Sequence, residues 1–126
     1  MAMTWTWYLL SQHPREEAML HAELAAVLGG RAPTDEDVGK LVYTRMVIEE
    51  SMRLYPPVHT ISRSALADDT LLGRTIPKGS TILIVPWVLH RHRLLWKNPG
   101  AFIPERFSAE PVSYTHLGAD GTRRDA

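Results

Sequence analysis

The chain has 126 residues, of which 44% are hydrophobic, so it is long enough to form one domain with a hydrophobic core. Lysine and arginine together number 14, as do aspartate and glutamate, and this balance gives no electrostatic support for binding nucleic acid or an acidic membrane. The absence of cysteine excludes disulfides, thiolate nucleophiles and thiolate metal ligands from this chain. No apolar run reaches the ~20 residues of a membrane-spanning helix, and the start lacks signal-peptide features, which favours a cytoplasmic location.

The first part of the chain predicts two helices. Residues 4–12 are apolar and start abruptly with no cap ahead of them, as in the last part of a longer helix. A second helix begins at Pro14, which suits a first helical turn, and ends at Gly29-Gly30. Its apolar positions recur at helical spacing and predict a broad core-facing stripe: Met19, Leu20, Ala22, Leu24, Ala26, Val27 and Leu28.

Two further helices are predicted before the pattern changes. Thr34, with Asp37 three residues later, resembles a capping box and predicts a short helix. The next helix is predicted from about Thr44 to Leu54, because Pro56-Pro57 prevents its continuation.

The second half of the chain predicts short strands and loops. Three segments have strand character, and the last two flank a tight-turn sequence, Pro77-Lys78-Gly79-Ser80; the segments are 60–66, 71–76 and 81–85. Residues 87–92 predict a short helix, and prolines give 93–111 an extended, loop-like path. Residues 112–126 are rich in Gly, Asp, Arg and Thr and predict a disordered tail.

Glu50 and Arg53 are the most informative charged pair. They lie three residues apart and therefore share one helix face, while Arg106 follows in the turn Pro104-Glu105-Arg106-Phe107. Together the three side chains could form a charge-assisted network. The commoner alternative is an exposed helical ion pair worth about 0.3–0.5 kcal/mol. The sharp turn at Pro56-Pro57 favours the buried arrangement.

The histidines and Arg63 allow more than one interpretation. Metal binding by the histidines is disfavoured, because His90 and His92 are spaced so that their rings diverge in a helix and no acidic residue lies beside them. Surface positions are therefore expected for all six: His13, His21, His59, His90, His92 and His116. Arg63 is either a solubility charge on an edge strand or a group that binds a ligand carboxylate or phosphate.

The order and spacing of several motifs resemble the cytochrome P450 family of haem-thiolate monooxygenases. These motifs are Glu50-x-x-Arg53 followed by Leu54-Tyr55-Pro56-Pro57, then Arg63, Ile76-Pro77-Lys78-Gly79, His90-Arg91, and Trp96-x-x-Pro99-x-x-Phe102-x-Pro104-Glu105-Arg106-Phe107. The resemblance spans about residues 4–108. It implies a mostly α fold with a small antiparallel β-sheet, an α+β class, with residues 1–111 forming part of the family's domain and 112–126 unmatched.

The resemblance also implies roles for individual residues. Glu50, Arg53 and Arg106 resemble a structural salt-bridge triad, and Arg63 resembles the arginine that hydrogen-bonds a haem propionate. Residues 58–61 resemble the segment that lines the substrate pocket: Val58, His59, Thr60 and Ile61. For the complete enzyme, the resemblance implies haem as cofactor, O2 and a small apolar substrate, and a ferredoxin or flavoprotein reductase as electron donor.

The sequence departs from the family where the axial cysteine is expected. After Ser108 the chain contains no cysteine and no glycine-rich ligand loop, so the thiolate that promotes O–O cleavage has no source here. We therefore expect an internal piece of a monooxygenase, inactive by itself, with no catalytic residue and no metal ligand. The alternative is a non-enzymatic helix and sheet interaction module.

Overall fold

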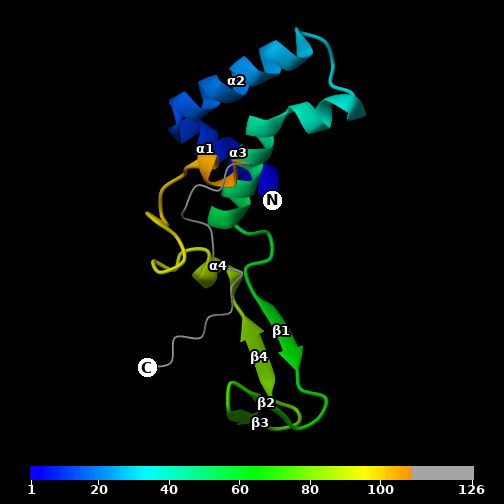
Figure 1. The fold of residues 1–126 in the computed structure, drawn as a ribbon, viewed down its shortest axis with the longest axis vertical. Coiled ribbons are helices and arrows are strands. Elements are labelled where there is room, and N and C mark those ends of the chain that lie inside the picture. Colours follow the sequence, from blue (N-terminus) through cyan, green and yellow to red (C-terminus); the bar gives the residue numbers. More distant parts are fainter. Residues whose placement is uncertain (109–126) are drawn as a thin grey trace.

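The computed structural model describes residues 1–108. Four α-helices, four strands and two short 3₁₀ helices (η) follow one another along this part of the chain. Their bounds are α1 Ala2–Gln12, α2 Pro14–Leu28, η1 Asp35–Lys40, α3 Val42–Leu54, β1 Ile61–Ser64, β2 Asp69–Leu71, β3 Arg74–Ile76, β4 Thr81–Ile84, α4 Pro86–Leu89 and η2 Pro104–Phe107. The helices α1, α2 and α3 gather at one end, and the strands extend away from them (Figure 1).

The helix boundaries follow from local chemistry. Pro14 occupies the first turn of α2, and Gly29 ends that helix in a left-handed conformation with φ of 57°, which costs glycine little. The capping box predicted at Thr34 and Asp37 is present and opens η1. α3 begins two residues earlier than predicted, at Val42, and ends at Leu54 ahead of the two prolines.

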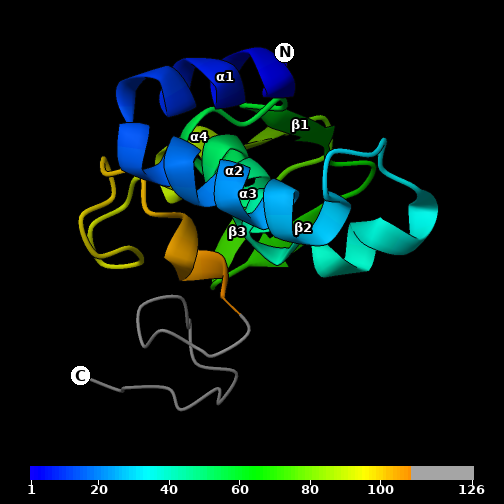
Figure 2. The same ribbon diagram turned by 90° about the horizontal axis from the view of Figure 1, so that it is seen from above.

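The hydrophobic core is built around α3. Val47 is completely buried, and α3 packs against α1, α2 and η2. Viewed from above, α2 crosses in front of α3 and α1 runs along the upper edge of the view (Figure 2). The core therefore joins the start of the chain to the segment that precedes η2, and its members are Leu9, Leu10, Leu20, Tyr43, Met46, Val47, Leu54 and Phe102.

The strands form two small antiparallel sheets where the sequence predicted one. β1 pairs with β4, with Ile61 opposite Ile84, and β2 pairs with β3. The strand predicted over 71–76 is not continuous, because Leu72 and Gly73, with φ of 49° and 74°, form a turn between the end of β2 and β3. A leucine at positive φ is uncommon, so the residue types did not predict this hairpin. The fold class, mostly helical with antiparallel strands, is confirmed.

The apolar residues of α2 are less buried than predicted. Leu20 is the buried member of the predicted stripe, whereas Met19 is 38% exposed. In α1 the opposite faces differ, because Leu9 and Leu10 are buried while Trp7 is 62% exposed. Within residues 1–108, no helix is both long and apolar enough to span a bilayer.

Candidate functional site: a buried charge cluster on α3

Glu50 and Arg53 form a bidentate ion pair on the buried face of α3. Arg53 Nε donates to Glu50 Oε2 at 2.7 Å, and Arg53 Nη2 donates to Glu50 Oε1 at 2.8 Å. Their side chains are 0% and 1% exposed, so this is the buried arrangement and not the exposed ion pair. Arg45 and Glu49, by contrast, form an exposed pair at 3.3 Å on another face. We call Glu50, Arg53 and Arg106 the charge cluster.

Arg53 links α3 to the loop that follows α4. Its Nη1 donates to the carbonyls of His90 at 2.7 Å and Pro99 at 2.9 Å, and its Nη2 donates to the carbonyl of Ala101 at 3.1 Å. With the two bonds to Glu50, all five guanidinium N–H donors are used. A planar fork can meet this set of acceptors, and a single ammonium nitrogen cannot.

Glu50 and Arg106 connect the cluster to η2. Besides Arg53, Glu50 Oε1 accepts from the backbone N–H of Ile103 at 2.9 Å and from Arg106 Nε at 3.3 Å. Arg106 is 4% exposed, and its Nη2 donates to the carbonyl of Asn98 at 3.0 Å. Asn98 has φ of 48°, a conformation that asparagine tolerates better than most residues. The cluster thus contacts the backbone of the 90–106 segment at several points.

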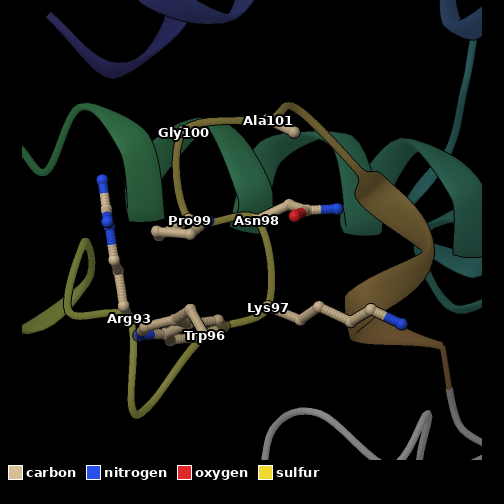
Figure 3. Close-up of a pocket in the computed structure, with 7 residues that line it drawn as sticks. All are labelled: Arg93, Trp96, Lys97, Asn98, Pro99, Gly100 and Ala101. Atoms are coloured by element: carbon tan, nitrogen blue, oxygen red, sulfur yellow. The ribbon is translucent and has the colours of Figure 1, made fainter.

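The loop over residues 93–101 lines a pocket of about 600 Å³ that is open to solvent. Figure 3 shows this loop passing in front of α3 on its way to η2, with Pro99, Gly100 and Ala101 nearest the helix. Trp96 covers one face of the Arg53 guanidinium, 4.9 Å from its ring centroid, and its Nε1 donates to the carbonyl of Leu89 at 3.1 Å. The indole therefore shields the buried charge on one side.

The net positive charge of the cluster explains why it needs so many backbone hydrogen-bond acceptors. One carboxylate and two guanidinium groups leave an excess of positive charge in a dry environment, and burying a charge is costly unless it is hydrogen-bonded. The carbonyls of His90, Pro99, Ala101 and Asn98 supply the missing negative ends of dipoles. The arrangement orders a loop, and no group in it is placed as a nucleophile or proton donor.

The remaining candidate residues lie apart from the cluster. Arg63 is exposed on β1, opposite Ile82, and its Nη1 donates to the carbonyl of Ser62 at 2.9 Å. Within residues 1–108 its other guanidinium N–H groups have no partner. The segment after Pro57 is also open: Val58 is 57% exposed, His59 and Thr60 are exposed, and Ile61 is half-buried.

The histidines differ from one another. Within the part of the chain that the structure describes, no three His, Asp or Glu side chains gather as a metal site would require. The prediction of surface positions is wrong for His13 and His90, which are half-buried, with Nδ1 atoms that meet backbone carbonyls at 2.7 and 3.1 Å. His116 lies outside the described residues.

Comparison with known proteins decides the family. The sequence profile described as Cytochrome P450 matches residues 1–118. The chain belongs to the cytochrome P450 family. It is 46% identical over 118 residues to cyclooctatin synthase of Streptomyces melanosporofaciens. The aligned residues cover 94% of this chain and 26% of that protein.

Two further P450-related proteins show the same partial coverage. Cyclooctat-9-en-7-ol 5-monooxygenase of Streptomyces melanosporofaciens is 41% identical over 117 residues, which cover 93% of this chain and 26% of that protein. Cytochrome P450 4A14 of Rattus norvegicus is 37% identical over 116 residues, which cover 90% of this chain and 23% of that protein. The chain spans about a quarter of the length of these P450 relatives.

The P450 family implies haem as the cofactor of the complete enzyme. The exposed Arg63 guanidinium has free donors suited to a carboxylate such as a haem propionate. No cysteine exists in the 126 residues to supply the axial thiolate. The chain therefore lacks the group through which a P450 holds its iron.

Proposed function

We propose that this chain supplies the structural framework beside the haem in a P450 monooxygenase. The observation that carries the proposal is the charge cluster, in which the bidentate Glu50–Arg53 pair and Arg106 close the 90–106 segment onto α3. In this role the three residues are a structural triad and none of them reacts. Membership of the P450 family supports the same assignment.

Arg63 and the segment before β1 would face the cofactor and the substrate. Arg63 would hydrogen-bond a haem propionate, because its planar fork matches a carboxylate and the side chain is exposed on β1. Val58, His59, Thr60 and Ile61 would form part of the substrate wall, since two prolines ahead of them limit the backbone freedom of the segment. The substrate class we propose is a small apolar organic molecule.

The complete enzyme would insert one oxygen atom from O2 into that substrate, with two electrons from a ferredoxin or a flavoprotein reductase. One relative's name states a 5-monooxygenase acting on cyclooctat-9-en-7-ol, which supports the reaction class. This chain by itself is proposed to be inactive, because the thiolate ligand is absent. We propose residues 1–111 as part of the P450 domain; because the family profile matches residues 1–118, a tail unrelated to the family would begin only after residue 118.

Two measurements test the proposal. The coding sequence downstream of this chain is expected to encode a loop that carries the cysteine ligand. An intact downstream coding sequence without such a loop would contradict the assignment to a monooxygenase. The isolated chain, mixed with haemin, reduced and exposed to carbon monoxide, is expected to give no thiolate-type Soret band. Appearance of that band would refute the proposed inactivity.

The alternative function is a non-enzymatic interaction module, and one observation favours it. Leu9 and Leu10, on a helix whose other face is open, are buried within the chain's own core. A soluble monomer that melts cooperatively would support a self-standing module. Aggregation, or unfolding without a cooperative transition, would support a framework that needs the rest of a P450 domain, because Trp7, Leu83 and Trp87 are 62%, 62% and 46% exposed.

A further inference from the structure

The helix that carries Glu50 and Arg53 has no cap of its own at its start. The residue before α3 is Leu41, which offers no side-chain hydrogen bond, and the first turn of α3 contains no acidic residue. The first amides of a helix need acceptors, and the positive end of its dipole favours a negative charge nearby. A group outside α3 must therefore supply the hydrogen-bond acceptors and the negative charge.

Glu23, on the neighbouring helix α2, supplies both the acceptors and the charge. Its Oε1 accepts from the backbone N–H of Tyr43 at 2.6 Å, and its Oε2 accepts from the N–H and the hydroxyl of Thr44 at 2.8 Å each. One carboxylate thus satisfies two amides of the first turn and places a negative charge at the helix start.

His90 meets the corresponding need at the other end of α3. Its Nδ1 lies 3.1 Å from the carbonyl oxygen of Arg53, in the last turn of the helix. A carbonyl only accepts, so Nδ1 carries the proton. In return, the carbonyl of His90 accepts from Arg53 Nη1 at 2.7 Å. The side chain of each residue therefore bonds the backbone of the other, across 37 positions of sequence.

We propose that Glu23 and His90 are positioning residues that hold α3 at both ends and thereby set Glu50 and Arg53 against the 90–106 segment. The inference goes beyond the proposed function, because it concerns how the charge cluster is assembled and needs no haem. A local capping role alone would stabilise the ends of α3. A positioning role must also affect the hydrogen bond at Ile103, whose backbone N–H donates to Glu50 Oε1 at 2.9 Å.

The first test replaces His90 in the full chain with two amides. His90→Asn puts an amide N–H near the place of Nδ1, and His90→Gln puts it near the place of Nε2. We expect His90→Asn to keep the slow hydrogen exchange of the Ile103 amide and His90→Gln to accelerate it about tenfold or more. The 15N spectrum of the unmodified chain is expected to show His90 with its proton on Nδ1. His92→Gln, at an exposed neighbour, is the control.

The second test removes the Glu23 carboxylate. Glu23→Ala is expected to accelerate exchange of the Tyr43 and Thr44 amides about five- to tenfold, and the Ile103 amide with them. Glu17→Ala, on the same helix and half-exposed, is the control and should change none of these rates.

The proposal is overturned by any of three results. These are fast exchange of the Tyr43 and Thr44 amides in the unmodified chain, an unchanged Ile103 amide in both Glu23→Ala and His90→Gln, or a proton on Nε2 of His90. None of these readouts depends on haem or on a downstream cysteine, so they are independent of the carbon monoxide and coding-sequence tests of the proposed function.

Discussion

Arg53→Lys isolates what the guanidinium fork contributes beyond its charge. The arginine uses five N–H donors: two reach Glu50 and three reach the carbonyls of His90, Pro99 and Ala101. Lysine has three donors on one nitrogen, so at least two of these buried acceptors lose their partner. Each unsatisfied buried group costs about 1–3 kcal/mol, which predicts a loss of about 2–6 kcal/mol in the free energy of unfolding.

Two further considerations narrow the predicted loss in the free energy of unfolding of Arg53→Lys. Breaking a buried ion pair costs about 3–5 kcal/mol, and lysine would retain the charge but not the bidentate geometry. The contact with Trp96, 4.9 Å from the Arg53 guanidinium carbon, would also weaken. We therefore expect a loss near the middle of the range, about 4 kcal/mol, which is a large part of the stability of a small domain.

The assay is urea denaturation of the full chain, followed by tryptophan fluorescence, with amide exchange of Ile103 as a local measure of the same cluster. Arg45→Lys is the matched control, because Arg45 forms an exposed pair with Glu49 on the same helix and should change stability by less than about 0.5 kcal/mol. The reasoning fails if Arg53→Lys costs no more than Arg45→Lys and leaves Ile103 exchange unchanged.

Other predictions concern groups with displaced pKa values. The pKa of the Asp37 carboxyl lies well below its ordinary value of 3.8, first because Arg31 binds it through two nitrogens and next because the Thr34 amide donates to it. Its stabilising contribution is therefore present above about pH 4 and is lost as the pH falls, and Asp37→Asn should remove this acid sensitivity in a pH series of thermal melts. Burial raises the pKa of the Tyr43 phenol to about 12, aided by the negative charge of Glu105. Tyr43 should thus stay neutral at pH 11 in an ultraviolet titration, and the contribution of its neutral form should disappear as the pH rises from 10 through 12. Within residues 1–108 its hydroxyl has no partner, so Tyr43→Phe should cost under about 0.5 kcal/mol, and a loss above about 2 kcal/mol would reveal an unrecognised hydrogen bond.

The sequence by itself determined the helices and the pairing within α3. Proline at position 14, the glycines at 29 and 30, the Thr34–Asp37 box and Pro56-Pro57 act through the backbone of their immediate neighbours, so the boundaries they predict appear almost unchanged. The three-residue spacing of Glu50 and Arg53 likewise fixes a shared helix face. The three-residue spacing could not decide whether that helix face is exposed to solvent or buried, since burial depends on which elements pack against it.

Tertiary structure alone decided which distant groups complete the site. Arg53 bonds carbonyls, which every residue possesses, so no residue type marked His90, Pro99 or Ala101 as its partners. The same holds for Glu23, which lies 20 positions before the Tyr43 amide that it caps. The β2–β3 hairpin was missed for another reason, because Leu72 adopts a positive φ that leucine rarely takes, although its side chain is 96% exposed. Local sequence specifies local backbone geometry, whereas a buried charge takes whichever dipoles the fold brings within reach.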